Sequence, residues 1–180
     1  SGGGLFKSTG ADYPAIVAQK DYSLPIIHTI HALLEVPGLG VLAGTPQGVM
    51  RVTSTGELEK AVIGEDQYEL GVKNLYHDYV GTIWLCGDGS EIIGYRTDGE
   101  KRVLNESNGL KGYARCAYLD SKERLWVGTT AGLFYLKEDH LYAVGEKTAG
   151  FDQTVSQIAE DSYGRLWLGT RDGLLVLSSN

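Results

Sequence analysis

Three aspartates, Asp78, Asp120 and Asp161, recur at a regular spacing in this chain of 180 residues. Carboxylates that lie close together can act as a general acid and a general base. Each of these aspartates, however, opens a turn and precedes a tryptophan by six residues. The tryptophans are Trp84, Trp126 and Trp167. An aspartate in such a turn accepts hydrogen bonds from backbone N–H groups two residues later. We therefore expect the aspartates to lie apart around one rim and to have a structural role.

Other residues with chemical potential are few. His28 and His31 lie three residues apart, and on a strand such positions face opposite sides of the sheet. On a helix the usual zinc pair has the H-E-x-x-H spacing, which the sequence lacks. Cys86 and Cys116 are too few for a disulfide framework, and we expect both to be buried thiols. The sequence also lacks a G-x-S-x-G motif, a P-loop, a C-x-x-C motif and an EF-hand loop. It therefore predicts no catalytic residue, no metal site and no cofactor.

The composition excludes some partners. The net charge is −7 at pH 7, which argues against binding to a nucleic-acid backbone. No run of 18 apolar residues is present, so we expect no membrane-spanning helix, and the first residues do not resemble a signal peptide. Twenty-five glycines are about double the usual share and predict many tight turns.

The elements that position these residues follow from an internal repeat. Trp126 follows Trp84 by 42 residues, and Trp167 follows Trp126 by 41 residues. Leu42 lies 42 residues before Trp84, in a segment with a similar pattern. Glycine stands six residues after Leu42, Trp126 and Trp167, and Ser90 stands at the same place after Trp84. A period of 40–45 residues is typical of β-propellers, in which each repeat is one blade.

Each repeat contains four short strands. In the third, we expect strands at 113–119, 124–129, 132–137 and 140–146. The strand around Trp167 is apolar on successive residues, with Leu166 and Leu168 facing one side and Trp167 the other. A strand that is apolar on both faces must be covered on both faces. Gly128 and Gly169, two residues after their tryptophans, leave room for a close approach of the backbone. The fold class is therefore predicted to be an all-β propeller of four-stranded antiparallel blades stacked face to face around an axis.

The strand count leaves two arrangements open. The chain contains a partial blade at 1–20, complete blades at about 26–63, 72–106 and 113–146, and a partial blade at 154–178. It is either a segment of a larger propeller or a four-bladed ring in which strand 14–19 pairs with strand 173–178. In an open arrangement, the unpaired edges at 4–8 and 173–178 would favour association, including a homodimer.

Two stretches, DSKERLWVGTTAGL (120–133) and DSYGRLWLGTRDGL (161–174), resemble the repeats of the two-component regulator propeller family. The second repeat departs from this pattern at Cys86, Asp88 and Ser90, and the first matches only at Gly44-Thr45 and Gly48. Such repeats occur in the periplasmic sensor regions of hybrid histidine kinases of gut bacteria. The resemblance implies a non-catalytic sensor for oligosaccharides on the periplasmic side of a membrane. It also implies further blades or a downstream sensor domain as partners. The matching residues belong to the scaffold, so the resemblance transfers no binding residue.

A ligand-binding face follows from the topology. Connections between blades and hairpins between second and third strands emerge on the same rim. The variable residues there are the candidates for ligand binding: Gln47, Asp88, Glu91, Thr130, Arg171 and Asp172. Aromatic residues near the longer connections would suit the C–H faces of sugars. They are Tyr22, Tyr68, Tyr113 and Phe151.

Three other interpretations remain open. The rim residues could be ordinary solvated loop residues. The propeller could be a protein-interaction or assembly module. It could also be a fragment of an enzyme that acts on glycans, although the sequence provides no converging carboxylates for that role.

Overall fold

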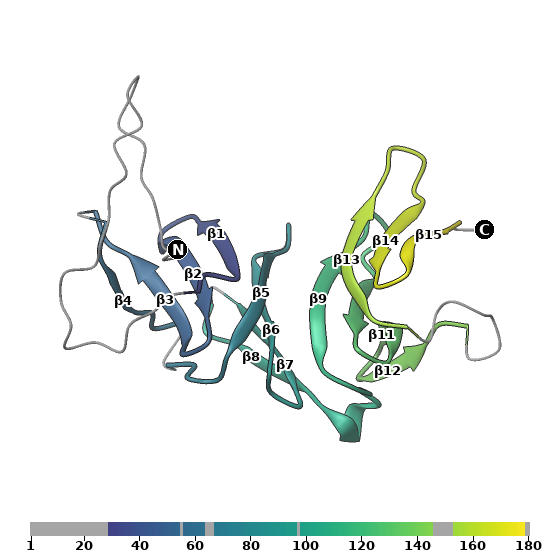
Figure 1. Ribbon diagram of the computed structural model, residues 1–180, viewed down its shortest axis with the longest axis horizontal. Helices are drawn as coiled ribbons and strands as arrows, with labels where there is room; N and C mark the ends of the chain where they lie inside the picture. The colour runs from purple at the N-terminus through teal and green to yellow at the C-terminus, as the bar shows by residue number, and fades with distance from the viewer. Residues whose placement is uncertain (1–28, 55, 64–66, 97, 146–152, 179–180) are drawn as a thin grey trace.

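The computed structural model describes residues 29–54, 56–63, 67–96, 98–145 and 153–178. Within these ranges the chain forms four antiparallel sheets, which follow one another along the sequence (Figure 1). We call the sheets blades 1 to 4. Blade 1 contains β1 (Ala32–Val36), β2 (Gly40–Thr45), β3 (Gly48–Val52) and β4 (Leu58–Lys60). Blade 2 contains β5 (Val72–His77), β6 (Thr82–Gly87), β7 (Ile92–Arg96) and β8 (Lys101–Leu104).

The second half of the chain repeats this plan. The single-turn 3-10 helix η1 (Glu106–Asn108) leads to blade 3. This blade contains β9 (Ala114–Leu119), β10 (Leu125–Thr129), β11 (Gly132–Lys137) and β12 (His140–Ala143). Blade 4 contains β13 (Val155–Glu160), β14 (Leu166–Thr170) and β15 (Gly173–Leu177). The predicted fold class, all-β with four-stranded antiparallel blades of a propeller, is confirmed. The predicted strands at 4–8 and 14–19 lie outside the described residues, so the segment of a larger propeller and the four-bladed ring both stay predictions.

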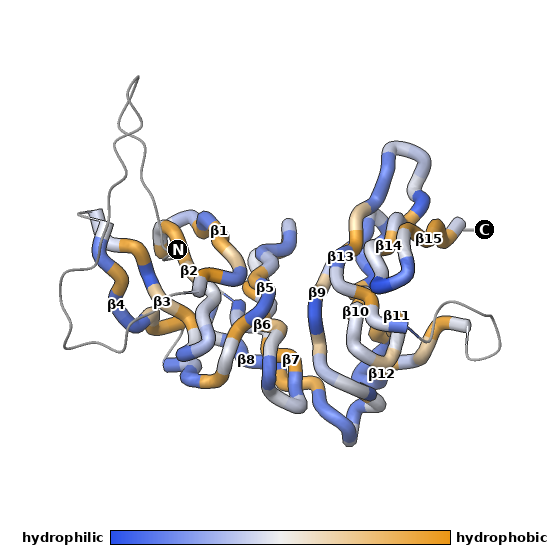
Figure 2. The backbone as a smooth tube through the Cα atoms, in the orientation of Figure 1, coloured by the Kyte–Doolittle hydropathy of each residue, from blue (hydrophilic) through white to orange (hydrophobic). Residues whose placement is uncertain are grey.

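The first strands of successive blades are neighbours. Strand β5 lies between β1 and β9, and β9 lies between β5 and β13, which produces the arc of sheets in Figure 1. Apolar residues occur along the strands of all four blades in Figure 2. They meet between the blades, because a sheet with two apolar faces is stable only when neighbouring sheets cover both.

The tryptophans lie at these junctions. Trp84 of blade 2 packs in one cluster with Leu125 and Val127 of blade 3. Trp126 of blade 3 packs in the next cluster with Leu166 and Leu168 of blade 4. In blade 1, Leu42 takes the same place and packs against Ile83 and Leu85 of blade 2. Blade 1 therefore presents Leu42, and blades 2 and 3 present their tryptophans, to the blade that follows.

Blade 4 presents an equivalent face that no further blade covers among the described residues; the Arg165 guanidinium lies 5.4 Å from the centre of the Trp167 ring. Trp167 pairs with Val176 and Gly169 pairs with Leu174, so all four residues share one face of the sheet. Leu174 is 64% exposed and Val176 is 41% exposed, whereas Trp126, the counterpart of Trp167, is buried. The sheet order also leaves the outer edge of β15 without a partner strand among the described residues.

Candidate functional site

One end of the blades carries the hairpins between second and third strands; we call it the hairpin rim. In blades 2, 3 and 4 the backbone of this hairpin is tied to a segment that leads into a first strand. Asp88 N donates to Gly71 O at 2.8 Å, Thr130 N to Tyr113 O at 3.0 Å, and Arg171 N to Thr154 O at 3.3 Å. Hairpins and entering segments therefore form one continuous surface.

The six predicted ligand-binding residues all lie in or beside hairpins of this rim. Gln47 is in the β2–β3 hairpin, and its side-chain oxygen is buried without a hydrogen bond among the described residues. Asp88 and Glu91 lie between β6 and β7, and Thr130 lies between β10 and β11. Arg171 and Asp172 form the turn between β14 and β15. Tyr68 and Tyr113 lie on the entering segments, whereas Tyr22, Phe151 and His28 lie outside the described residues.

Asp88 meets basic side chains from two blades. Its carboxylate lies 3.3 Å from Lys73 Nζ of blade 2 and 3.8 Å from Arg115 Nη1 of blade 3. The Lys73 amine in turn lies 3.2 Å from His31 Nε2, just before β1. We call His31, Lys73, Asp88 and Arg115 the mouth cluster. Lys73 and Arg115 lie on the first strands β5 and β9, and His31 directly precedes the first strand β1. These first strands are neighbours along the arc of blades.

Backbone bulges account for this convergence. The register of β5 with β6 shifts between Val72 and Asn74, which leaves Lys73 as the extra residue. The register of β9 with β10 leaves out Arg115 in the same way, and that of β13 with β14 leaves out Ser156. A β-bulge re-aims the side chain of its extra residue. Each of these three blades therefore directs one polar residue out of the regular ladder at the same level of the rim.

Sequence reasoning missed Lys73 and Arg115, although the repeat contains a signal for them. Arg115 follows Lys73 by 42 residues, and Lys73 follows His31 by 42 residues. Ser156 continues the series 41 residues after Arg115. Four polar residues thus occupy one phase of the repeat, at the start of a first strand that is otherwise mostly apolar.

The electrostatics of the hairpin rim differ from residue to residue. Burial and the neighbouring Lys73 charge lower the pKa of His31, against an opposing effect of Asp88. Burial, followed by the Glu91 carboxylate, raises the pKa of Tyr68 to about 12. At neutral pH the mouth cluster therefore contains two cations, one carboxylate and a neutral imidazole, in a chain whose net charge is −7.

The opposite end carries the turns that begin at the three aspartates; we call it the aspartate rim. Asp120 is fully buried, and one carboxylate oxygen accepts from Lys122 N at 2.9 Å and Arg124 N at 2.8 Å. The other oxygen accepts from Trp126 Nε1 at 2.8 Å and Arg124 Nε at 2.7 Å. Burial alone would raise the pKa of Asp120, but these hydrogen bonds outweigh it and the pKa is lowered. The pKa of Asp161 is lowered as well, and the hydrogen bond from Trp167 is the main cause. Carboxylates held in this way cannot supply a proton at neutral pH.

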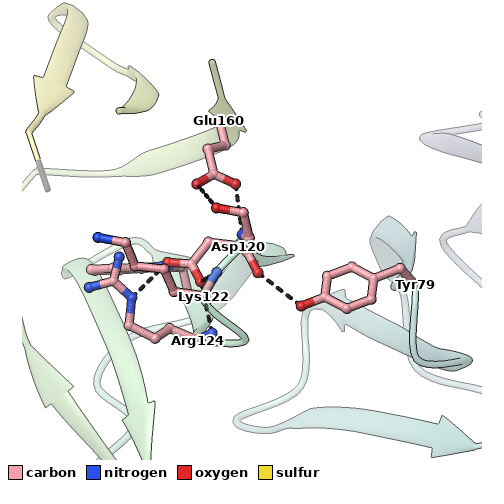
Figure 3. A network of polar contacts seen from close by, with 7 residues as sticks. Tyr79, Asp120, Lys122, Arg124 and Glu160 are labelled. Atoms are coloured by element: carbon pink, nitrogen blue, oxygen red, sulfur yellow. Dashed lines mark hydrogen bonds and ion pairs between the residues drawn. The ribbon is translucent and has the colours of Figure 1, made fainter. Parts of the chain in front are cut away.

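Polar contacts at the aspartate rim also join neighbouring blades (Figure 3). The Tyr79 hydroxyl of blade 2 donates to the Asp120 carbonyl of blade 3 at 3.1 Å (Figure 3). Ser121 of blade 3 donates from its backbone and its hydroxyl to the Glu160 carboxylate of blade 4, at 2.8 Å and 2.6 Å. These groups are engaged in holding the blades together, so the hairpin rim is the better candidate for binding.

Other features of the described residues support no catalytic or metal site. No group of three or more His, Cys, Asp or Glu side chains there could hold a metal ion. Cys86 and Cys116 are buried free thiols, as predicted, and burial raises the pKa of both. That part of the chain also contains no helix with the length and hydrophobicity of a membrane span.

Residues 150–172 match the family model described as two-component regulator propeller. No curated protein sequence matches the chain. An extracellular domain of BT4673 from B. thetaiotaomicron shares 20% identity over 92% of this chain and 23% of its own length, with a TM-score of 0.68. The extracellular domain assigned to a hybrid two-component system, BT3049 of the same bacterium, shares 20% identity over 82% and 21%, with a TM-score of 0.64.

Enzymes share this architecture as well. Virginiamycin B lyase from Staphylococcus aureus shares 17% identity over 81% of this chain and 54% of its own, with a TM-score of 0.52. At such identities the likeness concerns the fold alone. The chain spans about a fifth of the length of the B. thetaiotaomicron domains. The predicted family resemblance is confirmed: the chain is a series of β-propeller blades that carries a two-component regulator propeller repeat at residues 150–172.

Proposed function

We propose that the chain is a non-catalytic, ligand-sensing part of a bacterial two-component receptor and binds an oligosaccharide at the hairpin rim. A location on the periplasmic or extracellular side of the membrane belongs to this proposal. The family match supports the receptor role, and so does the likeness to extracellular domains of two-component systems. Binding would act by favouring one arrangement of the receptor over another rather than by turnover.

The contrast between the two rims is the observation that carries the proposal. At the aspartate rim, the Asp120 carboxylate accepts four hydrogen bonds from its own turn and from Trp126. At the hairpin rim, charged side chains from blades 2 and 3 converge in loose contacts of 3.3 and 3.8 Å. Tyr113, two residues before Arg115, is half exposed on the same rim. Aromatic and polar groups in this combination suit a sugar, which stacks on a ring and hydrogen-bonds through its hydroxyls.

The experiment is a thermal unfolding screen of the 180-residue chain against acidic and neutral oligosaccharides from plant and host glycans. A ligand at a hundred times its Kd stabilises the native state by about 2.7 kcal/mol. For a domain of this size, we expect the melting temperature to rise by about 5–10 °C. Arg115→Ala should reduce the rise by about half or more, because a tenfold loss of affinity leaves the ligand at about ten times its Kd. Lys122→Ala, at the aspartate rim, should leave the rise intact. Chromatography of the bound sugar should show no cleavage. A screen without any stabilising sugar, or a sugar consumed in the assay, would contradict the proposal.

The second candidate function is that of an assembly module. The exposed face around Leu174 and Val176 favours it, and so does the edge of β15, which has no partner strand in the part of the chain that the structure describes. Contiguous exposed apolar residues of this kind mark interaction surfaces. A concentration-dependent mass, combined with no response to sugars, would support assembly over sensing.

A further inference from the structure

We propose that the ligand of the hairpin rim carries an acidic group, as in a uronic-acid oligosaccharide, and that Lys73 and Arg115 bind that group. This inference rests on the proposed function and specifies its ligand class. Lys73 belongs to blade 2 and Arg115 to blade 3, so the two cations come together only where these blades meet.

The cations of the mouth cluster are available for an additional anion. The side chains of Lys73 and Arg115 are each 29% exposed, so both are partly desolvated and still reachable. Asp88 is the single carboxylate with an ion pair to either of them among the described residues, and its contacts are longer than a close charge-assisted hydrogen bond. Two cations share one carboxylate, which leaves a local excess of positive charge in an acidic protein.

The neighbouring groups preserve this local excess of positive charge. The His31 imidazole has a lowered pKa and is neutral at pH 7, so its ring nitrogen can accept a hydrogen bond from the Lys73 amine 3.2 Å away. That contact orients Lys73 without cancelling its charge. Arg115 has five donors in a planar arrangement that matches a carboxylate. Among the described residues this long contact to Asp88 is the one ion pair of Arg115, so most of these donors are available to a second carboxylate.

Asp88 acts as a resident competitor in this arrangement. Its side chain is 53% exposed, so water screens part of its attraction to the two cations. Gly71 gives it space, because a Cβ there would lie 2.5 Å from the Asp88 carboxylate. A ligand carboxylate near Lys73 and Arg115 would be repelled by Asp88 and attracted by both cations. Removal of the Asp88 charge should therefore strengthen the binding of an acidic ligand.

The test is calorimetric titration of the 180-residue chain with uronic-acid trisaccharides based on galacturonate, glucuronate and mannuronate. Their carboxyl-reduced, neutral counterparts serve as matched ligands. We expect at least one acid to bind and its neutral counterpart to bind at least about tenfold more weakly, as expected for the loss of a charged hydrogen bond. Lys73→Gln and Arg115→Gln should each lower the affinity for the acidic sugar by about tenfold, whereas Arg115→Lys should lower it less.

Two further variants separate the possible outcomes. Asp88→Asn should increase affinity for the acid, and Lys122→Gln, which removes one charge at the opposite rim, should leave it unchanged. Equal binding of acid and neutral sugar, or weaker binding after Asp88→Asn, overturns this inference but leaves the oligosaccharide sensor intact. If none of the acids binds while neutral sugars do, only this inference fails. If no sugar binds at all, the proposed function fails with it. Melting curves of each variant show whether the chain remains folded.

Discussion

The indole N–H of Trp126 donates a hydrogen bond of 2.8 Å to the carboxylate of Asp120, six residues earlier. The same bond joins Trp84 to Asp78 at 2.9 Å and Trp167 to Asp161 at 2.8 Å. Each carboxylate thereby connects the turn that starts the second strand to the tryptophan of that strand, which in blades 2 and 3 faces the next blade. This hydrogen bond accounts for the constant six-residue spacing of aspartate and tryptophan in the sequence.

Replacement of Asp120 tests the energetic weight of the bond. Asp120→Ala leaves two backbone N–H groups and the Trp126 indole without their acceptor at a fully buried site. We expect the free energy of unfolding to fall by about 2–4 kcal/mol, as measured by urea denaturation. The control is Asp139→Ala, which removes an exposed ion pair with Arg102 and should cost under about 1 kcal/mol. A similar small loss for both variants would show that the turn does not depend on the carboxylate.

The same aspartates predict how stability depends on acid. The pKa values of Asp120 and Asp161 are lowered in the folded chain, whereas an unfolded aspartate titrates near about 3.9. A group with a lowered folded pKa contributes its full stability above the unfolded pKa, and the contribution is lost as the pH falls toward the folded value. We expect the melting temperature to decrease steeply below about pH 4. Asp120→Asn should flatten this decrease; an unchanged slope would assign the acid sensitivity to other carboxylates.

The repeat predicts more about the scaffold than about the site. The positions of β10 and β14 could be predicted from the repeat alone, because each contains a run of apolar residues around a tryptophan that must be covered on both faces. The hydrogen bond between the Trp126 indole and the Asp120 carboxylate was not predicted, because the spacing alone does not show that the turn bends Asp120 toward Trp126. The mouth cluster was not predicted from the sequence for a different reason. A period shows that Lys73 and Arg115 are equivalent, but not that a bulge turns each out of its ladder toward Asp88 of one blade.

Two glycines at the same place in successive blades provide a matched pair. A Cβ at Gly128 would lie 2.5 Å from Cys116 Sγ and 2.7 Å from Val155 O of blade 4, so the neighbouring blade must shift. A Cβ at Gly169 would meet nothing closer than 3.3 Å. We expect Gly128→Ala to lower the free energy of unfolding by about 1–3 kcal/mol. Gly169→Ala should change it by less than about 0.5 kcal/mol. Equal losses would show that the contact between blades 3 and 4 does not limit stability.

A strained turn offers a stabilising substitution. Glu123 has a φ of 61° at the position that Gly81 and Gly164 occupy in the turns of blades 2 and 4. A non-glycine residue in this left-handed region costs roughly 1 kcal/mol, and glycine avoids that cost. We expect Glu123→Gly to raise the free energy of unfolding by about 0.5–1 kcal/mol, since the loss of chain stiffness in the unfolded state offsets part of the gain. Glu123→Gln, which keeps the strain, should not stabilise the chain, and a gain in that variant would attribute the effect to charge instead.

The exposed face of blade 4 should make the 180-residue chain associate. Trp167, Leu174 and Val176 occupy the face that, in blade 3, packs against the next blade, and Leu174 is 64% exposed. Contact between two such faces would remove apolar surface from water. We expect sedimentation to show a mass that increases with concentration, and Leu174→Ser with Val176→Ser to restore the monomer. Tyr163→Ser, which removes an exposed aromatic residue at the aspartate rim, should leave association unchanged. If the mass does not depend on concentration, the hydrophobic gain at this face is too small to hold two copies together, and the assembly function loses its main support.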